Sequence, residues 1–543
     1  MSLAERRLLA REAVISTALA ASLAALLLWA TPPGIDWAAH AYQRTFLLQH
    51  GFAIWNNFWY AGRYSFVTYS LLYYPLAALL GIRVLALASV AAAAFSFSVV
   101  MYRQWGPVAR TSSRSFAVLW VGIIGAAAFP FALAMSFALL ALWALQERRR
   151  GRFALCAALT LAASPLAFAF LVVVLAGALV ARRDLRNLGE LTTPLAVLLA
   201  CGVAELALYR LFGDGGRFPY GLLQLAPSLI FAGLGIVVTW RVPRARVLHG
   251  MFWIYLVVCV VAYLVPSSVG SNLERLRYVA IPVALIACAL RNWRPLWLVV
   301  PAVVLAGLWN GTPIFTNLAR ANTDPEAARA YWQPAIHYLK ANLSPSYRVE
   351  VVDTAEHWAG AYLPDAGIPI VRGWYRQSDF PQNELLYDGK LGAKTYERWL
   401  RRMGVRYVVL TDAPADYSSR NEAALVDSGR TDLVLAKQLP HARIYELPHP
   451  TPLVTGPAPA TVLWLWSQGL VAVTQRPGTY RVRVRWSPYW RSSNGCVSKT
   501  PDGMTQLRTT EPGLVELSFS VSVTRGLETL AGTIPTCSKT QDR

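Results

Sequence analysis

The sequence predicts a polytopic α-helical membrane protein with a C-terminal water-soluble region that combines an α/β part and a β-sandwich part. Composition is the first reason, because the 543 residues are 55% hydrophobic and only 15% charged. The second reason is how the charge is distributed. Residues 1–310 hold 25 arginines, no lysine and nine acidic residues, whereas residues 311–543 hold 26 basic and 21 acidic residues. We therefore expect a transmembrane domain at 1–310 and soluble domains beyond it.

The first part consists of apolar segments separated by short basic loops. About eleven segments are expected to cross the membrane, although several are shorter than the ~20 residues of a simple span. They are residues 13–30, 84–101, 115–129, 131–146, 153–164, 165–181, 193–210, 222–240, 249–265, 278–290 and 295–309. The loops contain the basic clusters Arg103/Arg110/Arg114, 148–152, Arg182/Arg183/Arg186, Arg241/Arg244/Arg246 and Arg291/Arg294.

The positive-inside rule places these loops and the N-terminus in the cytoplasm of a multi-pass plasma-membrane protein, and the C-terminal region outside. The net charge of +21 then reflects arginines that set the orientation of the helices and contact anionic membrane lipids. It does not indicate binding to nucleic acid. The first segment is expected to be a retained helix, because the Pro-rich stretch after it does not resemble a cleavage site. Residues 67–80 are apolar, but a crossing there would invert every later loop. We expect this segment to be interfacial or re-entrant.

The soluble region is expected to contain two domains. Residues 311–451 predict a mixed α/β domain, with a helix over 325–341, a strand over 347–352 and a helix over 396–403 that leads into a buried strand at 405–410. Residues 452–543 alternate between apolar and polar side chains, notably at 479–486 and 514–523, which predicts an antiparallel β-domain. Cys496 and Cys537 are the only cysteines of this region, and whether they pair is left open.

Asp36 is the leading candidate for a functional residue. It follows the first apolar segment, so the orientation above puts its carboxylate at the outer membrane surface. His40 and Arg44 come four and eight residues later and would share one helix face with it. Such a carboxylate could take a proton from a hydroxyl while the arginine holds an anion. The alternative is that Asp36 only caps a helix.

A second cluster lies at the outer start of a late helix, at residues 267–278. It contains Asn272, Glu274, Arg275 and Arg277. The two guanidinium groups could bind a lipid-linked phosphate through paired hydrogen bonds. The alternative is a surface ion pair between Glu274 and one of the arginines, with no ligand. Two other acidic residues fall on the outer side, of which Asp214 is expected to be a turn residue.

Aromatic residues are concentrated at 55–64, where Trp55, Trp59 and Tyr60 form a candidate surface for sugar rings. The same composition is typical of any membrane–water interface, so this pattern has low specificity. The sequence has no Walker loop, no dinucleotide-binding glycine turn, no HExxH and no paired CxxC. ATP-driven transport is therefore disfavoured. No Asp-x-Asp element occurs in the outer loops, so we expect neither a bound metal nor another cofactor.

These motifs together resemble the GT-C superfamily of membrane glycosyltransferases. The chain is most similar to bacterial multi-spanning proteins called 6-pyruvoyl-tetrahydropterin synthase-related. The matching residues are Gly34-Ile-Asp36, His40, Arg44, Gly51, Trp55, Trp59-Tyr-Ala-Gly62, Tyr73-Tyr-Pro-Leu76, Asn272 and Arg275-Leu-Arg277-Tyr278. In the soluble part they are 358–362, 371–375, 399–409 and 485–495. Many relatives carry a second acidic residue next to the first, whereas Trp37 follows Asp36 in this chain.

The resemblance implies a transferase that takes a sugar from a polyprenyl-phosphate donor at the outer face of the membrane. Asp36 would be the general base and His40 would orient it. Arg275, Arg277 and Arg44 would bind the donor phosphate, while Trp55, Trp59, Tyr60, Asn272 and Glu274 would contact the substrate. The acceptor would be an envelope glycan or glycolipid, and the Arg-rich, Lys-free helices fit an actinobacterial envelope. The alternative is a non-catalytic envelope protein that binds or helps to export a glycolipid or polysaccharide.

Overall fold

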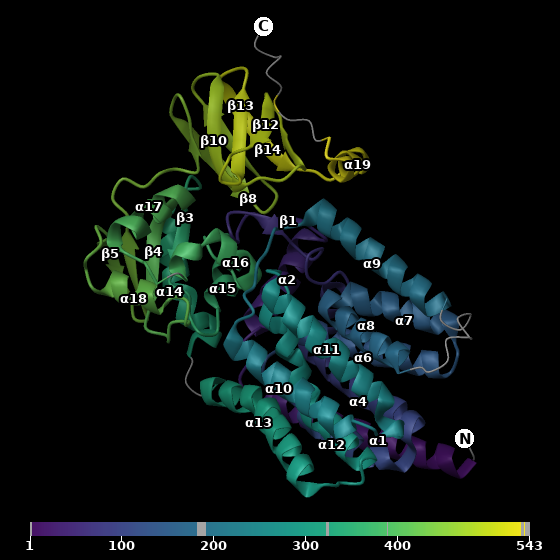
Figure 1. Cartoon of the computed structure of the whole chain (residues 1–543). Helices are drawn as coiled ribbons and strands as arrows, with labels where there is room; N and C mark the ends of the chain where they lie inside the picture. Colours follow the sequence, from purple (N-terminus) through teal and green to yellow (C-terminus); the bar gives the residue numbers. More distant parts are fainter. Residues whose placement is uncertain (1–2, 182–191, 322–324, 388, 534–536, 538–543) are drawn as a thin grey trace. The chain divides into compact units, whose positions relative to one another are not determined.

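The computed structural model describes residues 3–181, 192–321, 325–387, 389–533 and 537 (Figure 1). Two compact units are present. The first contains residues 1–37, 69–206 and 217–323, and the second contains residues 38–68, 207–216 and 324–543. The boundary expected between the transmembrane and soluble parts lies near residue 310. The structure instead adds two segments from the N-terminal half, 38–68 and 207–216, to the second unit. The basic residues Arg182, Arg183 and Arg186 lie outside the described residues.

The first unit is a helical bundle. Its helices are α1 (Leu3–Ala30), α3 (Tyr73–Leu80), α4 (Ile82–Trp105), α5 (Arg110–Leu119), α6 (Phe129–Gln146), α7 (Arg150–Ala163), α8 (Pro165–Val180), α9 (Thr192–Phe212), α10 (Leu222–Thr239), α11 (Arg246–Leu264), α12 (Ala280–Leu290) and α13 (Leu296–Ala321). The 3₁₀ helices η2 (Trp120–Ile123) and η5 (Gly270–Val279) precede α6 and α12. The last turn of α9 belongs to the second unit.

Small residues let these helices approach one another closely. In α1 the buried positions include Ala13, Ser16, Ala20 and Ala24, and this side of the helix packs against α4. Spacings of three and four residues put such side chains in one stripe, which is how membrane helices pack in the absence of a hydrophobic driving force. Glu12 in the same helix is buried, and Arg114 of α5 binds both of its carboxylate oxygens at 3.0 Å. A buried charge in the first span is thus paired.

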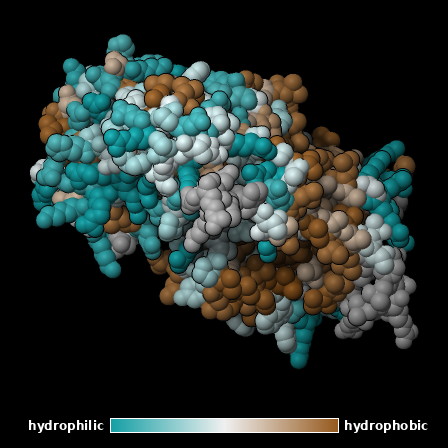
Figure 2. Space-filling view, turned by 90° about the horizontal axis from the view of Figure 1, so that it is seen from above, coloured by the Kyte–Doolittle hydropathy of each residue, from teal (hydrophilic) through white to brown (hydrophobic). Residues whose placement is uncertain are grey.

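The bundle carries the apolar surface that a bilayer requires. Six helical stretches of the described residues are long and apolar enough to cross a membrane: 3–30, 82–123, 129–146, 192–212, 222–239 and 243–264. Two shorter apolar helices, 165–180 and 296–312, accompany them. In α9, Leu195, Leu199, Val203 and Leu206 are all exposed at helical spacing. Figure 2 shows hydrophobic residues gathered in one broad region of the surface. The chain is a membrane protein, and the expected eleven spans are not confirmed.

The segment 67–80 forms a short element. Bends lead into α3, which is eight residues long and ends at Gly81, where α4 begins. Eight residues of α-helix rise about 12 Å, far less than the ~30 Å apolar thickness of a bilayer. The helix is too short to cross on its own, as the interfacial or re-entrant interpretation requires. Its depth in the membrane stays a prediction.

Among its described residues, the second unit holds three four-stranded sheets and a two-stranded sheet that pairs β1 (Trp55–Asn56) with β2 (Arg63–Tyr64). The strands β3 (Arg348–Val351), β4 (Val405–Thr411), β6 (Ala442–Glu446) and β5 (Val434–Gln438) form one sheet in that order, in which β3 and β4 are parallel. The helices of this part are α14 (Arg329–Asn342), α15 (Ala359–Asp365), α16 (Arg376–Gln382), α17 (Ala393–Met403) and α18 (Arg420–Asp427). The strands expected at 347–352 and 405–410 and the helix expected at 396–403 correspond to β3, β4 and α17, whereas the helix expected from residue 325 begins at Arg329. That 311–451 is a domain of its own stays a prediction.

Two antiparallel sheets of four strands follow and enclose one apolar core. Their orders are β12-β13-β10-β7 and β11-β14-β9-β8. The strands are β7 (Val454–Thr455), β8 (Ala460–Trp466), β9 (Gly469–Thr474), β10 (Gly478–Arg485), β11 (Trp490–Ser492), β12 (Cys496–Lys499), β13 (Met504–Thr509) and β14 (Gly513–Phe519). Helix α19 (Val523–Ala531) comes next, and a disulfide then joins Cys537 to Cys496, with Cα atoms 5.5 Å apart. Antiparallel strands are present as expected for 452–543, but the strand expected over 514–523 ends at Phe519 and α19 begins at Val523. That this stretch is a domain of its own stays a prediction.

Candidate functional site

Asp36 ends the loop between α1 and α2 (Trp37–His50), and backbone contacts fix this loop against a turn that precedes α6. The amide of Asp36 donates to the carbonyl of Ala126 at 3.2 Å, and the amide of Trp37 donates to the carbonyl of Gly34 at 2.9 Å. A Cβ atom on Gly34 would lie 2.3 Å from the carbonyl oxygen of Gly125, a separation that no carbon atom can adopt. Glycine at position 34 therefore lets the loop approach the turn and sets the position of Asp36.

Arg275 is a basic residue that lies against Asp36. It belongs to η5, whose ten residues make it far longer than most 3₁₀ helices, a feature often found at functional segments. Its Nη2 atom lies 3.8 Å from Oδ2 of Asp36, and the two side chains are 17% and 13% exposed. The guanidinium carbon also lies 5.3 Å from the ring centre of Phe131. The result is a half-buried ion pair whose arginine rests on an aromatic face.

The other polar residues of η5 pair among themselves. Nη1 of Arg277 lies 3.5 Å from Oε2 of Glu274, and its guanidinium lies 5.8 Å from the ring centre of Tyr278. Burial raises the pKa of Glu274, and the charge of Arg277 opposes that rise. The backbone amide of Asn272 donates to Val269 at 3.0 Å. The two arginines therefore have different partners. Arg275 contacts Asp36, whereas Arg277 forms an ion pair with Glu274 of the same 3₁₀ helix.

An apolar cavity opens beside Arg275 within the first unit. It encloses about 370 Å³ and lies among α4, α6, α8, α11 and the start of α12. Its lining includes Phe97, Phe131, Phe170, Met251 and Tyr255, with Arg275 as the cationic contribution. A cationic group beside an apolar channel between helices suits an amphiphile that has an anionic head and a hydrocarbon chain.

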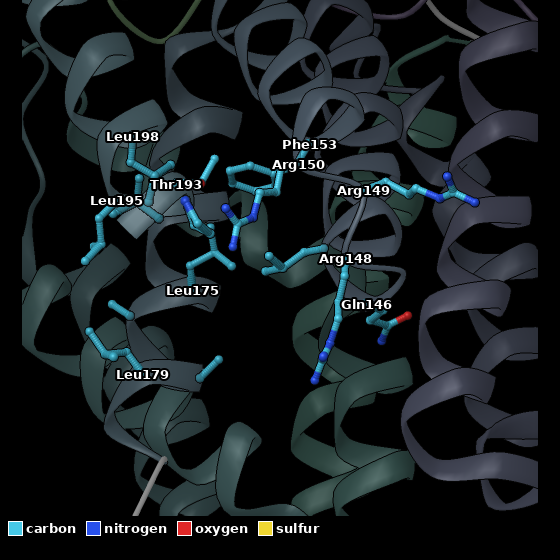
Figure 3. Close-up of a pocket in the computed structure, with 15 residues that line it drawn as sticks. Gln146, Arg148, Arg149, Arg150, Phe153, Leu175, Leu179, Thr193, Leu195 and Leu198 are labelled. Atoms are coloured by element: carbon cyan, nitrogen blue, oxygen red, sulfur yellow. The ribbon is translucent and has the colours of Figure 1, made fainter. Parts of the chain in front are cut away.

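A second cavity of about 470 Å³ lies where α6, α7, α8 and α9 meet (Figure 3). Leu145, Gln146, Leu175 and Ala178 line both cavities, so the apolar space extends along α6 and α8. Figure 3 shows the Arg149 side chain pointing away from Leu195 and Leu198, and the Arg150 side chain pointing toward them. Contact of this basic cluster with anionic lipid headgroups stays a prediction.

His40 and Arg44, the predicted companions of Asp36, lie in α2 and belong to the second unit. His40 is fully buried, whereas Arg44 is half-buried. Asp36 itself precedes the first residue of α2 rather than lying within the helix. The roles of His40 in orienting the base and of Arg44 in binding phosphate remain predictions.

The aromatic stretch 55–64 forms part of the core of the second unit. The indole nitrogen of Trp59 donates to the carbonyl of Gly360 at 2.8 Å, and the hydroxyl of Tyr60 donates to the carbonyl of Tyr375 at 3.0 Å. Trp55 stacks on Phe519 with ring centres 5.2 Å apart. Trp55, Trp59 and Tyr60 are each at most 1% exposed, which leaves no ring face open to a sugar. Substrate binding by these three stays a prediction, and their burial favours a structural role.

Asp214 is more than the turn residue expected from its glycine-rich surroundings. Its Oδ2 atom lies 3.5 Å from Nη2 of Arg63, and the amide of Tyr64 donates to its Oδ1 atom at 3.4 Å. Burial raises the pKa of Asp214 to about 6, against the opposing effect of Arg63. The guanidinium of Arg63 also lies 3.9 Å from the ring centre of Tyr375. The pair therefore joins three segments of the second unit.

A polar cluster in the α/β part was not predicted. It lies where the parallel strands β3 and β4 end, the edge at which such sheets usually bind ligands. Arg372 contacts Asp379 at 2.6 Å and Glu422 at 3.6 Å, and Arg376 contacts Asp416 at 2.7 Å. Burial opposes the charge of Asp379, yet Arg372 and several hydrogen bonds hold its pKa below the ordinary value. The arginines pair with acidic residues of the same cluster, as expected of a structural network. Asp416 and Glu422 follow far along the chain from Arg372, so no local pattern predicts the cluster.

Among the described residues, no group of three or more histidine, cysteine, aspartate or glutamate side chains is placed to hold a metal ion. The expectation that no metal or other cofactor takes part stays a prediction. Fold and site together define a polytopic membrane protein with an acid–arginine pair beside an apolar cavity.

The chain has few detectable similarities to known proteins. No protein-family model matches the chain. A comparison with curated proteins also found no match. Among solved structures the chain is similar to the cryo-EM structure of the arabinofuranosyltransferase AftD from mycobacteria, at 17% identity and a TM-score of 0.43. The similarity covers 82% of this chain and 40% of AftD, so the chain spans less than half of that protein. At this level the likeness assigns no activity.

Proposed function

We propose that this protein is a membrane glycosyltransferase of the GT-C type that uses a polyprenyl-phosphate-linked sugar as donor. The acceptor is an envelope glycan or glycolipid at the outer face of the plasma membrane. The pairing of Asp36 with Arg275 at 3.8 Å, next to an apolar cavity, is the observation that carries the proposal. The GT-C resemblance of the sequence motifs supports it independently.

In the proposed reaction, Asp36 accepts the proton of an acceptor hydroxyl. The oxygen attacks the anomeric carbon of the donor, and the bond from that carbon to the phosphate oxygen breaks. The leaving lipid phosphate gains negative charge, which the guanidinium of Arg275 stabilises. The hydrocarbon chain of the donor occupies the cavity lined by Phe97, Phe131 and Phe170.

Binding of the donor would also prepare the base. Without substrate, the guanidinium of Arg275 lies 3.8 Å from the carboxylate of Asp36. A donor phosphate would compete for the same guanidinium. Once Arg275 turns to the phosphate, the carboxylate of Asp36 can accept a hydrogen bond from the acceptor hydroxyl in its place. Proton transfer would thereby depend on the presence of donor.

The test is complementation of a deletion strain with wild type, Asp36→Asn and the control Glu511→Gln, which changes an exposed acid outside the candidate site. Mass spectrometry would measure envelope glycans and lipid-linked sugars, and immunoblots would measure membrane protein levels. We expect Asp36→Asn, at normal abundance, to give a truncated glycan and to accumulate the lipid-linked donor. A wild-type glycan profile with Asp36→Asn would falsify the mechanism.

A non-catalytic envelope protein is the second candidate. Trp464 on the edge strand β8 is 67% exposed, and its ring centre lies 6.0 Å from that of Trp466. The exposed indole of Trp464, with the half-buried ring of Trp466 beside it, suits the flat face of a sugar. In that case Trp464→Ala would abolish co-sedimentation of the full chain with envelope polysaccharide, and Asp36→Asn would leave both binding and the glycan profile unchanged.

A further inference from the structure

Helix α19 presents an apolar stripe that the described residues leave uncovered. Val523, Leu527 and Leu530 are 83%, 62% and 48% exposed. Their spacings of four and three residues place the three side chains on one face of the helix. Arg525 and Glu528 lie on another face and pair at 3.2 Å. The helix is therefore amphipathic, with its apolar side open.

Contacts on the remaining face hold α19 in place. The hydroxyl oxygen of Ser522 accepts from the amide of Arg525 at 3.3 Å, which caps the helix, and from Arg491 of β11 at 3.4 Å. A Cβ atom on Gly526 would meet the side chain of Leu211 at 3.7 Å, which is ordinary contact distance. The disulfide at Cys537 ties the chain beyond the helix back to β12. The helix is thus held at both ends with its apolar stripe outward.

The contact with Leu211 relates α19 to the membrane. Leu211 lies in the last turn of α9, and α9 is one of the helices long and apolar enough to span a bilayer. In that same turn Phe212 belongs to the core of the β-sandwich, with Leu208 and Leu211 packed against it. A spanning helix ends where the hydrocarbon ends, so the last turn of α9 marks the level of the lipid headgroups. Helix α19 lies against that turn.

We propose that α19 is an interfacial anchor whose apolar stripe inserts into the headgroup region of the bilayer beside α9. A lipid surface fits better than a second protein, because three side chains cannot supply the ~800 Å² per partner of a stable protein interface. Short amphipathic helices bind at the boundary of headgroups and acyl chains through such a stripe. The anchor sets the β-sandwich at a defined height above the membrane.

The experiment measures the depth of individual positions in liposomes of phosphatidylethanolamine and phosphatidylglycerol. The full chain would carry Ala at Cys156, Cys201, Cys259 and Cys288, and would keep the Cys496–Cys537 disulfide. Nitroxide labels would be attached at Leu527→Cys and, as matched control, at Thr524→Cys on the exposed polar side. Power saturation would compare collision with oxygen, which partitions into lipid, and with a water-soluble nickel chelate.

We expect the oxygen-to-nickel ratio at position 527 to exceed that at 524 several-fold. Equal ratios at the two positions would show that the stripe stays in water, which overturns the proposal. A label at 527 that collides with neither reagent would show that protein covers the stripe, and this also overturns it. Both positions are exposed, so the labels leave the packing of the helix intact.

Discussion

Arg275 lies with its Nη2 atom 3.8 Å from Oδ2 of Asp36, and the same side chain lines an apolar cavity of the helical bundle. A loop near the start of the chain and an unusually long 3₁₀ helix far along it thus share one charged pair. The pair is half-buried, so each charge depends on the other more than a surface pair would. Four predictions follow from the contacts around it and in the second unit.

Arg275→Gln should impair donor use and Arg277→Gln should not, because only the first of these contacts Asp36 and lines the cavity. Loss of a charged contact costs about 1.5–3 kcal/mol, or roughly a ten- to hundredfold lower kcat/KM for the lipid-linked donor. Steady-state kinetics in proteoliposomes would measure this. Equal losses in the two variants would contradict the assignment.

Gly34→Ala should displace the loop that bears Asp36. The added Cβ atom would lie 2.3 Å from the carbonyl oxygen of Gly125, a backbone atom that cannot turn aside. Overpacking of this kind costs about 1–3 kcal/mol. We expect a lower melting temperature in detergent together with lost activity. Gly151→Ala is the control, since no atom lies within 4 Å of its Cβ position, and it should be neutral.

Trp59→Ala should unfold or loosen the second unit. The indole is 0% exposed, packs edge-on against Tyr375 and donates a hydrogen bond to Gly360. Removing a buried tryptophan typically costs about 3–5 kcal/mol. Limited proteolysis should then cleave within 324–543 far faster than in the wild type. Trp464→Ala, which removes an exposed ring, should leave the cleavage rate unchanged.

The second unit should lose stability as the pH rises toward 8. Burial raises the pKa of Glu422 to about 7 from 4.5, against the attraction of Arg372. The folded protein therefore binds a proton that the unfolded chain has released between these values, so its contribution is full below about pH 4.5 and is lost as pH rises through 7.

Melting of the full chain in detergent at pH 5 and pH 8 would measure this contribution. Glu422→Gln keeps the shape of the side chain and removes its titration, so its melting temperature should vary less between the two pH values. The hydroxyl of Tyr396, which donates to Glu422 at 2.8 Å, still finds an acceptor in the amide oxygen. An unchanged pH dependence in the variant would assign the effect to other groups.

Local patterns in the sequence predicted much of the architecture. The strand over 405–410 and the helix before it follow from apolar periodicity, and the structure has them as β4 and α17. The alternation after residue 452 predicted the antiparallel sheets in the same way. Asp36 and Arg275 were each selected as functional candidates, on charge and position alone. Each of these features depends on residues that are close together in the sequence, so it can be recognised without the tertiary structure.

Where the aromatic stretch 55–64 belongs could not be predicted, because Trp, Tyr and Asn suit a membrane interface and a protein core equally well. Trp59 is buried because residues far along the chain cover it, with Tyr375 packed against the ring and Gly360 accepting its hydrogen bond. The different partners of the two arginines in η5 also depend on tertiary contacts. Arg275 and Arg277 are equivalent in the sequence, and the positions of Glu274 and Asp36 separate their roles.

The sequence by itself determined that this is a membrane protein, the positions of β4 and α17, and the candidacy of Asp36, because hydropathy, charge and periodicity are local properties. The tertiary structure decided which of these elements meet. It placed residues 38–68 in the second unit, paired Asp36 with Arg275 and set α19 against the last turn of α9. Such contacts join residues distant in the chain, and their free energy arises only once packing brings the partners together.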